Sequence, residues 1–133
     1  MIIKEYKEYR EDEILRLYTE VGWNAYTEKP AVLRRGYEHS LVVLAAYENE
    51  ELLGIIRAVG DGFTVVFVQD ILVFPEKQRQ GIGTALMKAL LARYPEVRQV
   101  ELITDNTPQT KAFYQSLGFY EISETGCCGF MKK

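Results

Sequence analysis

The sequence predicts a mixed α/β fold in which helices pack on one sheet whose first half is antiparallel. Helical spacing of apolar residues occurs early in the chain and again late, whereas the middle contains long β-prone runs. The pair Asp61-Gly62 separates two of these runs, which is typical of a β-hairpin. Strands and helices alternate unevenly, and this disfavours a regular doubly wound sheet.

The N-terminal third is expected to contain one short strand and two helices. Proline suits the first turn of a helix, and glycine suits the position just after its end. The expected elements are a strand over residues 2–6, a helix from Asp12 to Gly22, a loop over residues 23–27 and a helix from Pro30 to about Ser40.

The remaining elements follow from β-branched runs and from the prolines and glycines between them. Strands are expected over residues 41–47, 52–59, 63–73 and 97–104. Helices are expected from about Gly83 to Tyr94 and from Pro108 to Leu117, the second capped by Asn106 or Thr107 and ended by Gly118. Two short closing strands are expected over residues 119–122 and 129–131.

Size, charge and cysteine content exclude several classes of protein. With 133 residues, the chain predicts one domain over residues 1–133. Its net charge of -3 disfavours nucleic-acid binding, and no apolar run is long enough for a membrane span. Cys127 and Cys128 are adjacent, which disfavours a disulfide scaffold and favours a cytoplasmic location. Two cysteines and one histidine predict no metal site.

A polar loop between a strand and a helix is the most informative stretch. Gly81 and Gly83 permit tight curvature, and the free N–H groups of a helix N-terminus bind anions such as a pyrophosphate. Lys77 and Arg79 add positive charge. A dinucleotide fingerprint would need a third glycine where Leu86 stands, and a P-loop would need Gly-Lys-Ser/Thr. From these residues alone, a plain glycine-containing turn is the alternative.

Three segments together resemble the GCN5-related N-acetyltransferase (GNAT) superfamily. They are Gln78-Arg79-Gln80-Gly81-Ile82-Gly83, the preceding run Asp70 to Pro75, and the later run Ala112 to Phe119. The resemblance implies a mostly antiparallel mixed sheet that is splayed at its middle strands and has helices on both faces. It also implies acetyl-CoA (coenzyme A) as cosubstrate and direct transfer of the acetyl group to a primary amine of a small molecule, peptide or protein.

The resemblance assigns the cofactor to the splayed strand and the polar loop. The main chain of Ile71, Leu72 and Val73 would pair with pantetheine. The pyrophosphate would lie on Gln78, Arg79, Gln80, Gly81, Ile82, Gly83 and Thr84. Asn106 either touches the cofactor arm or serves only as a helix cap.

Catalytic and acceptor residues are also implied, each beside a structural alternative. Tyr114 would protonate the leaving thiolate, or else packs as a core aromatic. Asp70 would act as the base through water, or else faces solvent or pairs with Arg57. Trp23 and Tyr26 would line the amine pocket, or else simply pack between helices.

A non-catalytic acyl-CoA sensor or regulatory module of the same fold is the alternative function. Tyr114 favours the enzyme, because a partner-binding module would tolerate its loss. Exposed edge strands would permit a homodimer. The sequence does not specify the amine acceptor.

Overall fold

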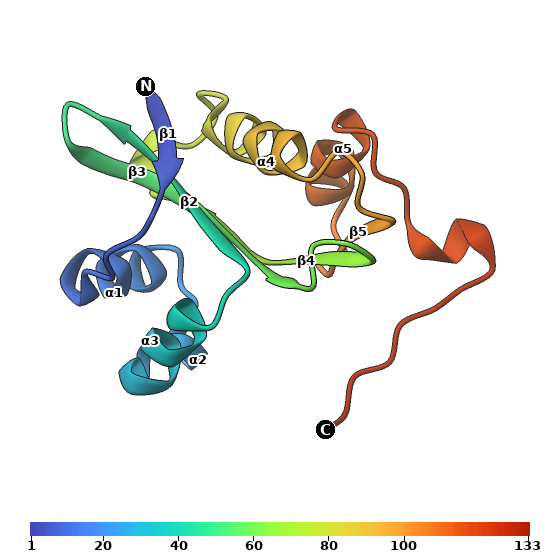
Figure 1. Ribbon diagram of the computed structural model, residues 1–133, viewed down its shortest axis with the longest axis horizontal. Coiled ribbons are helices and arrows are strands. Elements are labelled where there is room, and N and C mark those ends of the chain that lie inside the picture. Colours follow the sequence, from blue (N-terminus) through green and yellow to red (C-terminus); the bar gives the residue numbers. More distant parts are fainter. The chain divides into compact units, whose positions relative to one another are not determined.

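A five-stranded sheet forms the centre of the larger of the two units into which the chain divides (Figure 1). The structure is a computed structural model that describes residues 1–133. The larger unit is Met1–Ile103 and the smaller is Thr104–Lys133. The sequence shows no linker between them.

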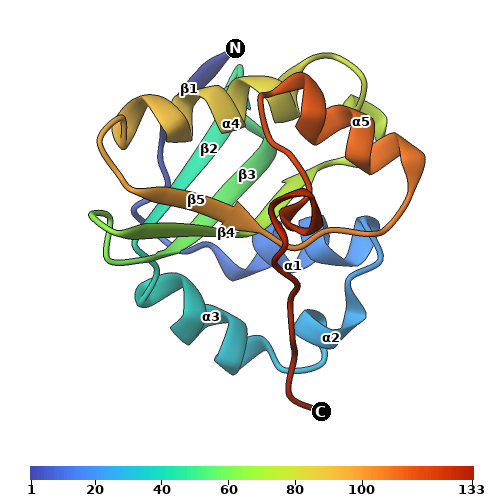
Figure 2. The same ribbon diagram turned by 90° about the vertical axis from the view of Figure 1, so that its right-hand side faces the viewer.

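The strands lie in the order β1-β2-β3-β4-β5, so neighbours in the sequence are neighbours in the sheet (Figure 2). The first three pairings are antiparallel, and only β4 and β5 run parallel. This confirms the mixed, mostly antiparallel sheet. The strands are β1 (Ile2–Glu5), β2 (Val42–Glu48), β3 (Glu51–Gly60), β4 (Val65–Val73) and β5 (Gln99–Leu102).

Helices cover both faces of this sheet, as Figure 1 shows. α1 (Glu11–Glu20), α2 (Asn24–Thr27) and α3 (Pro30–Glu38) lie on one side, and α4 (Ile82–Arg93) lies on the other. Because both faces are covered, residues on both sides of β2 and β3 are buried. α4 buries four apolar side chains against the sheet: Ile82, Leu86, Met87 and Leu90.

Two predictions in the first helical region are wrong. The N-cap of α1 is Arg10, not Asp12, so three acidic residues occupy the first turn, where the helix dipole favours negative charge. Residues 24–27 form the single turn α2, not a loop. A bond from the Glu28 N–H to the Asn24 carbonyl closes this turn at 3.0 Å. One turn is too short to show a periodic pattern in the sequence.

Short turns join the antiparallel strands, including the hairpin expected at Asp61-Gly62. Asn49 and Glu50 connect β2 to β3 with φ angles of 49° and 68°, the left-handed geometry that suits a two-residue turn. Asp61 closes the loop from β3 to β4, because its carboxylate accepts the backbone N–H groups of Phe63, Thr64 and Val65.

The smaller unit contains α5 (Pro108–Ser116) and the short 3-10 helix η2 (Ile122–Thr125). The N-cap is Thr107, whose side chain accepts the N–H of Thr110 at 3.2 Å. Gly118 follows the helix with φ 92°, as predicted. None of the helices in the chain has both the length and the apolar character of a membrane span.

The two predicted closing strands, residues 119–122 and 129–131, are wrong. η2 begins at Ile122, and residues 129–131 form no regular element. The smaller unit contains no strand that could pair with them, and an isolated strand lacks hydrogen-bond partners. Phe130 and Met131 are 95% and 77% exposed.

Candidate active site

A β-bulge at Gln69 reshapes the central strand β4. Arg57 of β3 lies opposite Asp70, whereas the next residue, Ala58, lies opposite Val68, so Gln69 is an extra residue on β4. An extra residue reverses the alternation of side chains along a strand. Asp70 and Val68 therefore lie on opposite faces of the sheet. The face of Asp70 is the one that α1 and α3 cover.

β4 and β5 separate just beyond this bulge. β5 pairs with β4 only from Val65 to Val68, while β4 continues to Val73. The edge of residues 69–73 that faces away from β3 therefore has no strand partner. On the other edge, Gly54 of β3 packs so closely that a Cβ would lie 2.5 Å from the Leu72 carbonyl oxygen. The unpaired edge of residues 69–73, on the side away from β3, confirms the predicted splay at the middle strands.

The loop after β4 brings free backbone N–H groups to the start of α4. Gly81 is the N-cap with φ 81°, and Arg79 is also left-handed with φ 65°. The first helical bond runs from the Ala85 N–H to the Gly81 carbonyl at 3.0 Å, so the N–H groups of residues 82–84 precede it. No side chain caps this end. Such an N-terminus, preceded by a loop that curves through left-handed residues, suits an anion.

Side chains fasten this loop beside the open edge of β4. The Gln78 side-chain amide donates to the Val73 carbonyl at 3.1 Å. Lys77 pairs with Glu51 at 3.6 Å, whereas Arg79 is exposed and makes no ion pair. The open strand edge and the uncapped N-terminus of α4 are therefore close together, at the end of β4. Of the two cations in this loop, Arg79 is the one available to a ligand.

Asp70 is buried with its partners behind the bulge. Its side chain is 0% exposed, and it accepts hydrogen bonds from Arg57 Nε at 2.7 Å, the Tyr18 hydroxyl at 2.8 Å and the Tyr26 hydroxyl at 3.2 Å. Solvent therefore does not reach the carboxylate, and the alternative in which Asp70 faces solvent is wrong. Pairing with Arg57 is confirmed.

Arg57 is held from several sides. Burial opposes its charge, but the Asp70 carboxylate beside it outweighs this effect and raises the pKa of Arg57. One terminal nitrogen donates to Ser40 Oγ at 3.2 Å, and the guanidinium lies 5.3 Å from the centre of the Tyr37 ring. Gly36 leaves room for it, since a Cβ there would lie 3.3 Å from the guanidinium.

Two buried tyrosines extend the network into the helical layer. The hydroxyls of Tyr18 and Tyr37 are 3.0 Å apart. Burial raises the pKa of both phenols, so they stay protonated over the physiological range. Tyr18 therefore acts as a permanent hydrogen-bond donor to Asp70.

Tyr26 connects this buried network to the surface. Its hydroxyl donates to Asp70 and accepts the Gln69 side-chain amide at 3.0 Å, on the exposed side. The Trp23 ring stacks on it, with centroids 6.1 Å apart and an interplanar angle of 25°. Trp23 is 38% exposed. The two residues predicted to line the amine pocket thus form one aromatic surface next to the bulge.

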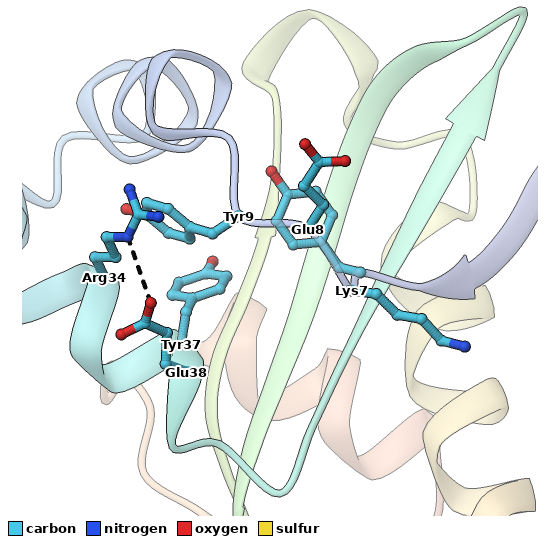
Figure 3. Close-up of a pocket in the computed structure, with 7 residues that line it drawn as sticks. Lys7, Glu8, Tyr9, Arg34, Tyr37 and Glu38 are labelled. Carbon is cyan, nitrogen blue, oxygen red and sulfur yellow. Dashed lines mark hydrogen bonds and ion pairs between the residues drawn. The ribbon is translucent and has the colours of Figure 1, made fainter.

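A separate cavity of about 360 Å³ lies between α3 and the segment that joins β1 to α1 (Figure 3). The rings of Tyr9 and Tyr37 pack edge-on in it, and Arg34 pairs with Glu38 at 3.4 Å. The buried Tyr9 hydroxyl has no hydrogen-bond partner. Nothing in the sequence indicated this cavity, which shares only Tyr37 with the Asp70 network. Its lining residues are Tyr6, Lys7, Glu8, Tyr9, Arg34, Tyr37 and Glu38.

The Acetyltransferase (GNAT) family profile matches residues 4–119. The chain belongs to this family. Among solved structures, the GNAT family acetyltransferase SP0256 from Streptococcus pneumoniae TIGR4 is 40% identical, with a TM-score of 0.90. The match covers 99% of this chain and 96% of that one. The GNAT fold predicted from the sequence is therefore confirmed.

Curated relatives also include named N-acetyltransferases. The uncharacterized N-acetyltransferase ycf52 of Gracilaria tenuistipitata var. liui is 27% identical over 80% of this chain, which spans 60% of that protein. Serotonin N-acetyltransferase 2, chloroplastic, of Oryza sativa subsp. japonica is 37% identical over 65% of this chain, which spans 46% of the relative. This GNAT chain thus covers about half the length of those two proteins.

Two predicted site residues of this GNAT protein, Tyr114 and Asn106, lie in the smaller unit. The Tyr114 ring packs edge-on against Phe113 and Phe119, with centroids 5.0 and 6.0 Å away, and burial raises its pKa. Asn106 is exposed, and the helix cap is Thr107, so the interpretation of Asn106 as that cap is wrong.

The side chains that could bind a metal, and the two cysteines, form no further cluster in the structure. No three His, Cys, Asp or Glu side chains converge as metal ligands, and Cys127 and Cys128 are exposed free thiols. Sequence reasoning missed Tyr18 and Gln69. Tyr18 lies on the apolar stripe of its helix and resembles a core residue there, while the bulge at Gln69 leaves no mark on composition or periodicity.

Proposed function

We propose that this GNAT protein transfers the acetyl group of acetyl-CoA to a primary amine by direct attack. The main supporting observation is the open backbone edge of β4 beside the uncapped N-terminus of α4. Coenzyme A carries two amides in its pantetheine arm and a pyrophosphate next to them. A free strand edge suits the amides, and clustered N–H groups suit the pyrophosphate.

The cofactor residues follow from this fit. The main chain of Ile71, Leu72 and Val73 would hold the pantetheine arm, and residues 78–84 would hold the pyrophosphate. Arg79 would add charge, whereas the Gln78 side chain would hold the loop against Val73. Asn106 would contact the cofactor arm. Acetyl-CoA supplies the activated thioester, and the protein supplies orientation and proton transfer.

Tyr114 is proposed as the general acid. As the amine nitrogen bonds to the carbonyl carbon, the C–S bond breaks and the sulfur takes up a proton. A tyrosine phenol is protonated at neutral pH, and burial, which raises the pKa of Tyr114, keeps it protonated until the thiolate forms beside it. A main-chain N–H near Leu72 would stabilise the oxyanion. Asp70 is proposed as the final acceptor of the proton that the amine loses.

The amine would lie against Trp23 and Tyr26. Stacked aromatic rings suit an arylalkylamine or another cationic amine. The rice relative named serotonin N-acetyltransferase 2 supports including arylalkylamines among the candidates. A cytoplasmic location stays a prediction, because the name of that relative contains the word chloroplastic.

Acetyl-CoA binding is the first test, measured by calorimetry on the purified chain. Wild type is expected to show saturable binding that Gly81→Glu abolishes, since a carboxylate would stand where the pyrophosphate binds. Gly126→Glu is a matched control, because Gly126 has φ 82° against 81° for Gly81 and neither has an atom within 4 Å of an added Cβ. Equal binding by wild type and Gly81→Glu would contradict the proposed cofactor site.

Turnover separates the enzyme from the alternative, an acyl-CoA sensor. CoA release is measured with a panel of alkylamines, polyamines, arylalkylamines and peptide N-termini. We expect release with at least one of them. Tight acetyl-CoA binding without release on any amine would favour the sensor.

A further inference from the structure

We propose that Tyr26 is a catalytic residue that takes the proton from the attacking amine and passes its own proton to Asp70. This inference rests on the proposed acetyl transfer. It names the group that removes the proton from the amine, which the open strand edge cannot do. Asp70 is the acidic group nearest the bulge, but its side chain is 0% exposed, so an amine cannot touch it. The proton therefore needs a carrier between the surface and the carboxylate.

The Tyr26 hydroxyl occupies that position. It donates to Asp70 Oδ1 at 3.2 Å and accepts from the Gln69 amide at 3.0 Å. A hydroxyl oxygen accepts two hydrogen bonds, so one lone pair stays free for the amine. Gln69 itself is exposed and is the bulged residue of β4, so the Tyr26 hydroxyl that it contacts lies beside the start of the open strand edge.

The groups that surround Asp70 leave only one of its oxygens, Oδ1, to receive the proton from Tyr26. Tyr18 from α1 donates to Oδ2 and cannot give up its proton, because burial raises its pKa. Arg57 from β3 donates to the same oxygen. Tyr37 from α3 contacts Tyr18 and Arg57. These three are positioning residues, which leave Oδ1 for Tyr26 alone.

The transfer is balanced within the proposed reaction. The nitrogen lone pair forms the C–N bond, and the C–S electron pair leaves on sulfur, which is protonated by Tyr114. One N–H bond breaks as an O–H bond forms on Tyr26, and the former Tyr26 proton forms an O–H bond on Asp70. After the amide leaves, the proton on Asp70 returns through Tyr26 to water, and Tyr114 regains from water the proton that it gave to the sulfur.

Two nearly isosteric amines test this step. 2-Phenylethylamine must first lose its ammonium proton to water, and the N–H of its adduct is then only weakly acidic and needs a base. O-Benzylhydroxylamine is already neutral near pH 7, and the N–H of its adduct is acidic enough to pass directly to water. We expect Tyr26→Phe to lower kcat/KM about 100-fold with the first amine and little with the second. A purely structural role would lower both rates alike. Tyr9→Phe is the control, because its hydroxyl has no partner.

Separate outcomes distinguish the two proposals. If wild type releases CoA and Tyr26→Phe affects both amines equally or neither, the carrier role is overturned while the acetyltransferase stands. If wild type binds acetyl-CoA but acetylates no amine, both proposals are overturned. If Tyr26→Phe does not fold, Tyr18→Phe replaces it: loss of one Asp70 donor changes the basicity of Asp70 and should change the rate with the alkylamine selectively, and an equal change on both amines overturns the proposal.

Discussion

Replacing Arg57 by methionine is expected to destabilise the fold strongly, because the change leaves a carboxylate buried without its cation. The Asp70 side chain is 0% exposed and the Arg57 side chain 7%, with 2.7 Å between Nε and Oδ2. Methionine fills much of the volume of the arginine stem. The main loss is therefore electrostatic, and not a cavity.

Removing one partner of a buried ion pair costs about 3–5 kcal/mol. Two phenols still donate to Asp70 in the variant, which places the expected loss toward the lower end. For a chain of this length, 1 kcal/mol corresponds to about 3–5 °C in Tm. We therefore expect Tm to fall by roughly 10–15 °C, from about 3 kcal/mol of lost stability.

Urea unfolding followed by circular dichroism measures this loss directly. Arg35→Met is the matched control, because Arg35 is exposed on α3 and makes no ion pair, so a change within about 0.5 kcal/mol is expected. The double variant Arg57→Met/Asp70→Leu should lose less than the sum of the single variants, since it removes the unpaired charge. A loss below about 1 kcal/mol for Arg57→Met would refute this account of the buried pair.

Two further predictions concern the smaller unit and a hairpin loop. Tyr114→Phe should lower kcat about 100-fold and leave acetyl-CoA affinity nearly unchanged in calorimetry, and an unchanged kcat across pH would exclude the general-acid role. The Thr64 hydroxyl and three backbone N–H groups lower the pKa of Asp61 in the folded state. The ionised carboxylate therefore stabilises the fold at any pH above about 4, the pKa of Asp61 in the unfolded chain. This contribution is lost as the pH falls through the lower pKa of the folded state. The difference in Tm between wild type and Asp61→Asn should therefore stay constant above about pH 5 and narrow as the pH falls below about 4, and a constant difference down to about pH 2 would contradict the assignment.

The backbone geometry of the candidate site was partly predictable, because the helix start at Gly81 depends on local backbone chemistry. Gly81 follows a polar loop and precedes an apolar helical stripe, and these features predict a helix start that suits an anion, with a plain glycine-containing turn as the alternative. Asp61-Gly62 predicted its hairpin for the same reason. Residues 119–122 and 129–131 were mistaken for strands because β-propensity does not reveal whether a pairing partner exists.

The sequence by itself determined most of the elements, their order, the GNAT family and the loop proposed for the pyrophosphate, since each depends on residues that are close together in the chain. Only the tertiary structure decided the environment of Asp70. The extra residue Gln69 turns the Asp70 carboxylate toward the helical layer. There it accepts hydrogen bonds from Tyr18 of α1, Tyr26 of α2 and Arg57 of β3. Such a network depends on strand register and helix packing, which bring together residues far apart in the sequence.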